Sequence, residues 1–195
     1  EMWFCADKQQ DNTTAYLFDT DVIGVTLENG KMKLYADDKV LLSMGNKTYT
    51  DGKWHHLAIN VLRNGNAIVY IDGETVGQMA STNVPALQTS YMYLGVHRVM
   101  DDMQNKLKGQ IDEVRVWNAT LNAKVLRDRM SSRLQGNEPG LVAYYPFEEE
   151  QLDANMQIVT EASALDMVTK RHKATGYSNN VHTIACTDEA PALKP

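Results

Sequence analysis

Two turn-forming dipeptides divide the middle of the chain into short, strand-like segments. Asn64-Gly65 follows the alternating segment 54–61, and Asp72-Gly73 follows the apolar segment 67–71. A two-residue type I′ turn requires positive φ at both central residues, which Asn-Gly and Asp-Gly adopt at little cost. The spacing therefore predicts that residues 51–74 form a β-meander.

Similar turn signals recur at short intervals through the first hundred residues, for example at Asn29-Gly30 and Asp51-Gly52. Short alternating strands between regular turns are typical of an all-β sandwich. Each strand should then have one buried face, which needs a second sheet to cover it. In the hairpin around Asn29-Gly30 the alternation separates an apolar face from a solvated face, namely Met32 and Leu34 from Lys31, Lys33 and Tyr35.

The period of the apolar residues changes after residue 120. The apolar residues then recur at the spacing of one face of a helix, namely Leu121, Val125, Leu126, Met130 and Leu134. Thr120 is the expected N-cap of this helix. Gly136 and Pro139-Gly140 should end the helix, and residues 141–147 then form a compact apolar strand. The sequence predicts one short peripheral helix beside the sandwich.

Three segments, in this order and at these separations, carry a family resemblance. They read DGKWHHLA (51–58), YIDGE (70–74) and GQIDEVRVWNATL (109–121). Together they resemble the laminin-G-like domains, which share the fold of the concanavalin A-like lectins and glucanases. The resemblance covers residues 1–147 and implies a two-sheet antiparallel jelly roll.

The resemblance also bears on domain organisation. A Gly-Leu-x-x-Tyr-Tyr-Pro-Phe segment opens a module in this family, whereas here it occupies 140–147, near the C-terminal end. We therefore divide the chain into a jelly-roll domain lacking its first strand (1–135) and a second part (136–195) with a weakly structured end. Residues 140–147 would either complete the same sandwich or open a next module. Either arrangement suggests tandem modules in one polypeptide.

Composition narrows the choice of partners. The chain has 195 residues and a formal net charge of −6, so nucleic acid is not expected, because phosphate binding needs a basic face. No apolar run approaches the length of a membrane span, and no export signal opens the chain. The resemblance instead implies a secreted or cell-surface protein that binds a glycan or an extracellular protein.

The two cysteines, Cys5 and Cys186, are far apart in the sequence. They form neither a disulfide framework nor a pair of closely spaced metal thiolates. Two isolated, buried thiols are one interpretation. A single Cys5–Cys186 bridge is the other, and it would imply an oxidising compartment.

Aromatic residues are the first candidates for contact with sugars. Trp54 and Trp117 lie inside alternating strands and correspond to core anchors in the family, so we expect both to be buried, like Trp3. Tyr49, Tyr91 and Tyr93 lie near turns or strand ends, where rings more often stay accessible. These three tyrosines are the predicted ligand-binding residues, although a half-buried strand tyrosine is the plainer interpretation of each.

Two places in the sequence are candidates for metal binding. His55 and His56 are adjacent on a strand and point to opposite faces, so they cannot share one ion. Asp101, Asp102 and Gln104 form an oxygen-rich loop that would suit Ca²⁺, and loops at this position bind calcium in pentraxin-type relatives of the fold. A solvated acidic turn is the alternative.

Catalysis is not expected. Retaining glucanases of this superfamily carry a Glu-x-Asp-x-Glu strand that sets the nucleophile and the acid/base on one face, and the chain has no such triplet. We interpret Asp112 as structural, since a carboxylate at a strand end survives burial by accepting backbone hydrogen bonds. The sequence therefore predicts a non-catalytic carbohydrate- or matrix-binding module. A structural spacer and a glycan-active enzyme with an unrecognised site are the alternatives.

Overall fold

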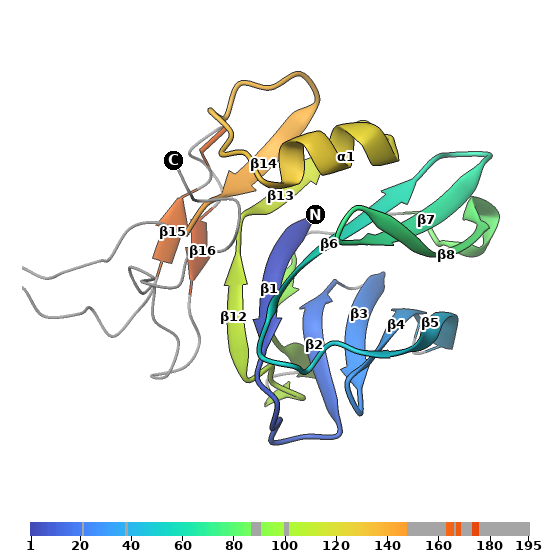
Figure 1. Ribbon diagram of the computed structural model, residues 1–195, viewed down its shortest axis with the longest axis vertical. Helices are drawn as coiled ribbons and strands as arrows, with labels where there is room; N and C mark the ends of the chain where they lie inside the picture. Colours follow the sequence, from blue (N-terminus) through green and yellow to red (C-terminus); the bar gives the residue numbers. More distant parts are fainter. Residues whose placement is uncertain are drawn as a thin grey trace, which may run out of the picture.

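Two five-stranded antiparallel sheets pack face to face in the computed structural model (Figure 1). The first sheet consists, in spatial order, of β12 (Gly109–Asp112), β1 (Met2–Ala6), β6 (Trp54–Val61), β7 (Asn66–Ile71) and β8 (Glu74–Ala80). The second consists of β5 (Lys39–Thr48), β4 (Lys31–Ala36), β3 (Ile23–Glu28), β2 (Thr14–Asp19) and β9 (Tyr93–Leu94). The expected two-sheet jelly-roll sandwich is confirmed.

Three two-stranded ladders and two short helical segments complete the described part of the chain. They are β10 (His97–Val99) with β11 (Asp102–Gln104), β13 (Val114–Trp117) with β14 (Leu141–Tyr145), β15 (Ser163–Leu165) with β16 (Lys173–Thr175), η1 (Ser81–Asn83) and α1 (Ala123–Met130). The structure describes residues 1–20, 22–37, 39–86, 91–99, 102–147, 163–165, 167–168 and 173–175.

The core fills the space between the two sheets. Its largest fully buried members alternate along their strands with residues that face outward, and they include Phe4, Leu17, Leu27, Met32, Leu34 and Leu57. Each such side chain contributes roughly 1.5–3 kcal/mol on burial. Met32 and Leu34 lie on the buried face, as the alternation predicts, so Lys31, Lys33 and Tyr35 are left on the opposite face.

Two of the predicted turns have the expected backbone. Asn29-Gly30 joins β3 to β4 and Asp72-Gly73 joins β7 to β8, and all four residues have positive φ. The type I′ turn predicted at Asn64-Gly65 is wrong, because only Asn64 has positive φ. The β6–β7 connection is longer there, and the amide of Gly65 donates to the carbonyl of Leu62.

Helix α1 is shorter than the apolar stripe suggests. Its N-cap is Asn122, whose side chain accepts a hydrogen bond from the amide of Val125 at 3.0 Å, so the expectation of Thr120 as the cap is wrong. Asn is among the strongest N-cap residues, and it stands two positions closer to the first full turn. Leu126 is the buried residue of the helix and packs against Ala58 and Tyr70 of the first sheet.

Strand β14 pairs with β13 of the same chain, with Val114 opposite Tyr145 and Arg115 opposite Tyr144. Leu141 and Tyr144 also pack with Leu134, which follows the helix. Residues 141–145 therefore form a two-stranded ladder with β13, outside the two five-stranded sheets. Completion of this sandwich by 140–147 and the opening of a next module both stay predictions. The division between 135 and 136 stays a prediction.

A buried polar network fills the corner between β12 and β13. The guanidinium of Arg115 is paired with the carboxylate of Glu113, which also accepts a hydrogen bond of 2.7 Å from the hydroxyl of Tyr144. Asp112 is buried and accepts a hydrogen bond from the amide of Glu113 at 2.8 Å, as its structural interpretation requires. Glu113 has a φ of 52°, so the strand direction changes at this residue.

Candidate functional site

The outer face of the second sheet gathers polar and aromatic side chains. Cross-strand register places them on one surface, because Tyr16 is opposite Thr26, Thr26 is opposite Lys33, and Lys33 is opposite Ser43. The same register adds Asp19, Gly24, Glu28, Lys31 and Tyr35 to this face. The opposite face of these strands is the sandwich core, so this outer face is available to a ligand.

A pocket of about 450 Å³ lies at one end of this outer face. We call it the tyrosine pocket, and its lining includes Tyr16, Asp19, Gly24, Tyr35, Tyr91 and His97. They come from β2, β3, β4 and β10, and from the segment just before β9. Three tyrosines and one histidine therefore surround a single hollow.

The rings of Tyr16 and His97 are stacked in this pocket. Their centroids are 4.5 Å apart and their planes are 14° from parallel. His97 Nδ1 lies 2.8 Å from Asp19 Oδ2, which fixes the orientation of the imidazole. An oriented imidazole beside a carboxylate gives this end of the face both hydrogen-bond donors and acceptors.

Gly24 makes room for this arrangement. A Cβ atom at position 24 would lie 3.1 Å from Asp19 Oδ1, 3.2 Å from Tyr16 Cε1 and 3.2 Å from the carbonyl oxygen of Phe18. All three distances are tighter than ordinary van der Waals contact, so any other residue would displace these neighbours. The glycine is thus needed for close approach rather than for its backbone freedom.

Tyr35 of β4 lines the tyrosine pocket and extends from it toward Glu28. Its hydroxyl donates to the carboxylate of Glu28, which also receives the ammonium group of Lys33. Burial and the hydrogen bond to Glu28 raise the pKa of Tyr35. Burial alone would raise the pKa of Glu28, but the hydrogen bonds from Lys33 and Tyr35 lower it overall. At neutral pH a protonated Tyr35 therefore donates to an ionised Glu28.

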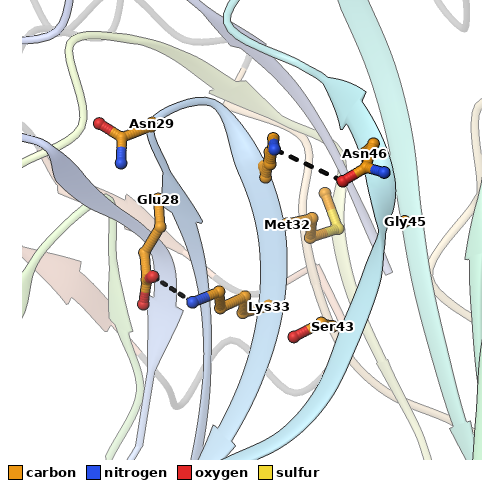
Figure 2. Close-up of a pocket in the computed structure, with 8 residues that line it drawn as sticks. Glu28, Asn29, Met32, Lys33, Ser43, Gly45 and Asn46 are labelled. Atoms are coloured by element: carbon orange, nitrogen blue, oxygen red, sulfur yellow. Dashed lines mark hydrogen bonds and ion pairs between the residues drawn. The ribbon is translucent and has the colours of Figure 1, made fainter.

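A second hollow of about 330 Å³ lies at the β3–β4 hairpin end of the same face, as Figure 2 shows. We call it the hairpin pocket, lined among others by Glu28, Lys31, Lys33, Ser43 and Asn46. This pocket exists because β5 bulges where it pairs with β4. Lys33 is opposite Ser43 and Lys31 is opposite Thr48, so the β5 segment between these two pairs is longer than the β4 segment. Gly45, at a φ of 68°, lies within the bulge.

Two of the three predicted ligand-binding tyrosines lie together at the tyrosine pocket. Tyr91 lines it and is 45% exposed, and the Tyr93 ring packs against it with centroids 5.0 Å apart. The expectation that Tyr49 is accessible is wrong, because it is only 2% exposed and packs edge-on against His55. Tyr49 follows the last residue of β5 and points into the core, so no ligand reaches its ring.

The tryptophans are placed largely as expected. Trp3 is buried and its indole donates to the carbonyl of Met130 at 2.8 Å. Trp54 and Trp117 are partly buried and pack against the core clusters around Trp3 and Leu134 respectively. None of the three lines either of the two pockets described above.

The two adjacent histidines point to opposite sides of β6. His55 lies between Asp72, at 2.9 Å, and Asp51, at 3.3 Å. His56 lies 3.2 Å from Glu1. They do not share a site, and the prediction of two separate structural histidines is confirmed.

The predicted calcium loop is only partly within the described residues. Asp101 lies outside them, Asp102 is described by its backbone in β11, and Gln104 is exposed. Among the described residues, no three side chains of His, Cys, Asp or Glu form a group that would hold a metal ion. Calcium binding by Asp101, Asp102 and Gln104 stays a prediction. So does the Cys5–Cys186 bridge, since Cys186 is also outside the described residues.

Tyr16, Asp19 and His97 were not singled out from the sequence. Only the alternation in the β3–β4 hairpin pointed to this face, because it placed Tyr35 with two lysines on the solvated side. The others come from strands that are distant in sequence, His97 being 78 residues from Asp19. Their convergence depends on the sheet order, which turn signals do not specify.

The chain belongs to the concanavalin A-like lectin/glucanases superfamily, whose family model matches residues 1–126. No curated protein matches the sequence. The structure of a presumed carbohydrate-binding protein from Bacteroides ovatus is similar over 95% of this chain, with a TM-score of 0.67 and 13% identity. The chain covers 55% of that structure, or about half its length.

Two further solved structures share less with the chain. One is the binding domain of Paraclostridial Mosquitocidal Protein 1, with a TM-score of 0.46, 13% identity, and coverage of 65% of this chain and 35% of that one. The other is an S-layer domain-containing protein from Clostridium thermocellum, with a TM-score of 0.36, 23% identity, and coverage of 62% and 64%. Within the described residues, no helix has the length and apolar character needed to cross a membrane.

Proposed function

We propose that this chain is a non-catalytic carbohydrate-recognition module and that the tyrosine pocket is its binding site. The observation that carries the proposal is the convergence of Tyr16, Tyr35, Tyr91 and His97 around one hollow, with Asp19 held by His97. Binding sites for small ligands combine apolar or aromatic walls with a few placed polar groups. A pyranose ring has an apolar face that suits an aromatic ring and hydroxyl groups that suit a carboxylate.

The charges around the pocket favour a neutral sugar. Asp19 and Asp37 line it, and the whole chain carries a formal net charge of −6. A carboxylate accepts hydrogen bonds from sugar hydroxyls but repels a uronate or a sulfate. The superfamily, and the description of the Bacteroides ovatus protein as a presumed carbohydrate-binding protein, support a carbohydrate as the ligand.

The setting of the module is proposed on the same grounds. Laminin-G-like domains suggest a secreted or cell-surface protein with neighbouring modules in the same polypeptide. A non-catalytic role is supported by the absence of a Glu-x-Asp-x-Glu strand from the sequence. Recognition of an extracellular protein and a spacer role would be alternative results of the test below.

The test is a glycan array with the purified chain, followed by calorimetric titration of the best ligand. The wild type is compared with Tyr91→Ala and with Leu62→Ala, a control at another exposed apolar side chain, 56% exposed, in the β6–β7 connection. We expect Tyr91→Ala to weaken binding roughly tenfold, because an aromatic contact contributes about 0.5–1.5 kcal/mol beyond its buried area. Leu62→Ala should bind like the wild type.

No binding anywhere on the array would overturn the proposed function. Binding that Tyr91→Ala leaves unchanged would overturn the proposed site. Running the array once with calcium and once with a chelator tests the predicted metal loop in the same experiment. Loss of binding in chelator, repeated by Asp102→Ala in calcium, would support the loop, and equal binding in both buffers would argue against it.

A further inference from the structure

The tyrosine pocket and the hairpin pocket occupy the same outer face of the second sheet. Gly24 and Tyr35 line the first pocket, and Glu28 and Lys33 line the second. We infer that the two hollows are the ends of one extended binding face, which takes a linear oligosaccharide lying along β3 and β4. This inference rests on the proposed function and adds to it the size and direction of the ligand.

The length of the face exceeds one sugar ring. Gly24 and Glu28 both lie on β3, four residues apart, with their side-chain positions on the same face. At about 3.3 Å per residue this separation is about 13 Å. A single pyranose cannot contact both ends, whereas an oligosaccharide aligned with the strands can.

Tyr35 and Glu28 join the two pockets directly. Tyr35 belongs to the tyrosine pocket and Glu28 to the hairpin pocket, and the hydroxyl of one donates to the carboxylate of the other. Lys33 holds the same carboxylate from β4 (Figure 2). The side chains of Tyr35, Glu28 and Lys33 therefore lie between the two hollows, and a ligand that enters both would pass over them.

Thr26 lies at the middle of the face, opposite Tyr16 on β2 and Lys33 on β4. It is fully buried, and its hydroxyl has no hydrogen-bond partner among the described residues. The side chains around Thr26, and not Thr26 itself, therefore form the surface between the two pockets.

The two ends of the face offer different chemistry. Aromatic rings surround the tyrosine pocket, whereas the hairpin pocket offers Lys31, Ser43 and Asn46 without any aromatic ring. Lys31 Nζ lies 3.4 Å from Asn46 Oδ1, which is a long contact, and both residues are exposed. One sugar unit would pack on rings at the first end, and a later unit would be held through its hydroxyls at the second.

The experiment is a chain-length series measured by calorimetry on the whole chain. The probes are cello-, laminari-, manno- and xylo-oligosaccharides of one to six units. In the series that binds, we expect affinity to rise roughly 3- to 10-fold with each added unit, because each adds one or two net hydrogen bonds. The rise should stop once the oligosaccharide spans both pockets.

Ser43→Trp tests the far end, since it fills the hairpin pocket and leaves the tyrosine pocket intact. It should remove the gain from added units and keep the affinity for the shortest ligand. Thr75→Trp is the matched control, at an exposed position on β8 of the other sheet. Melting temperatures of both variants establish that they fold.

The outcomes separate the two proposals. Affinity that is flat from one unit to six, but still falls in Tyr91→Ala, overturns the extended face and leaves carbohydrate binding at the tyrosine pocket standing. A Ser43→Trp variant that keeps the full gain of the longer ligands also overturns the extended face. If no probe binds and the array is silent, the proposed function fails and this inference fails with it.

Discussion

Gly24 is the residue at which the candidate site and the fold can be separated experimentally. A methyl group there would press on Asp19 and Tyr16, whose side chains can move, and on the backbone carbonyl oxygen of Phe18, which would have to shift by a few tenths of an ångström. Ala is also better suited than Gly to a strand interior, by roughly 0.5–1 kcal/mol. Steric pressure lowers the free energy of unfolding and the better strand propensity of Ala raises it, so the two effects oppose each other. The side chains of Asp19 and Tyr16 are displaced from the pocket in either case.

We therefore predict that Gly24→Ala lowers affinity for the ligand at least several-fold while the melting temperature changes little. Gly65→Ala is the control, because the three atoms nearest to its Cβ would all belong to the exposed side chain of Leu62. Titration and thermal unfolding of both variants provide the measurements. An unchanged affinity for Gly24→Ala would show that the close approach of Tyr16 and Asp19 is not needed for binding.

The pair formed by His55 and Asp72 gives a prediction about pH. The hydrogen bond with Asp72 raises the pKa of His55. Burial alone would raise the pKa of Asp72, but the hydrogen bonds from His55 and from the amide of His56 lower it overall. The histidine contributes stability that is complete below about 6.5, its ordinary pKa, and is lost as pH rises through its higher folded pKa. The aspartate contributes above about 3.9 and loses its contribution as pH falls.

The pair should therefore stabilise the fold most between about pH 4 and pH 6.5. Asp72→Asn removes the charge and keeps an acceptor for the amide of His56, and Asn tolerates the positive φ of this turn residue. We expect this variant to lower the free energy of unfolding by about 1 kcal/mol at about pH 5.5 and by less at about pH 8.5. The expected loss is small because the Asp72 side chain is 39% exposed and solvent screens its charge. Urea unfolding at both pH values measures this. A cost that is independent of pH would contradict it, and Asp128→Asn on α1 is the control.

A buried ion pair lies at the start of strand β13. Arg115 and Glu113 have side chains with no exposed surface, and Tyr144 on β14 completes the network. Removing one partner of a buried pair leaves the other charge without compensation, which typically costs about 3–5 kcal/mol. Replacing both partners removes the uncompensated charge of Glu113, and only the buried carboxylate of Glu1, 3.6 Å from Arg115, still loses a partner.

We predict that Arg115→Met lowers the free energy of unfolding by about 3–5 kcal/mol and that Arg115→Met with Glu113→Gln loses less than Arg115→Met alone. Urea unfolding of the two single variants and the double variant gives the coupling energy directly. If the two losses simply add, the pair is not the unit that holds the corner between β12 and β13.

The elements differ in how far the sequence predicts them. The β3–β4 and β7–β8 hairpins follow from local turn chemistry, and so does the buried face containing Met32 and Leu34. The error at Asn64-Gly65 arises because the same dipeptide fits a longer connection, which depends on where β6 ends. The N-cap of α1 was misplaced because Thr120 and Asn122 are both good caps, and packing of Leu126 against the sheet selects between them.

The candidate site is less predictable than the fold for a related reason. Tyr91 could be named as a loop aromatic, but Tyr49 could not be told from it, since both lie near strand ends. The difference is which face of the sandwich each ring meets, and this is fixed by pairings between strands far apart in sequence. The order of β2, β3, β4 and β5 brings the polar face together, and no local pattern encodes that order.

For the molecule as a whole, the open question is how much of the chain the sandwich needs. The sequence divides it after residue 135, yet β14 pairs with β13, and Tyr144 donates to Glu113 inside the buried network. Leu141 and Tyr144 also cover Leu134. A chain that stops at 135 would expose this cluster and leave Glu113 without one of its donors.

We therefore predict that residues 1–147 unfold at a melting temperature close to that of the full chain, and that residues 1–135 unfold at a much lower one. Tyr144→Phe in the full chain isolates one part of the effect, since it removes only the hydroxyl donated to Glu113 and should cost about 1–3 kcal/mol. Thermal and urea unfolding of these chains provide the comparison. Equal melting temperatures for 1–135 and 1–147 would mean that β14 adds to the sandwich without stabilising it, and that the domain does end near residue 135.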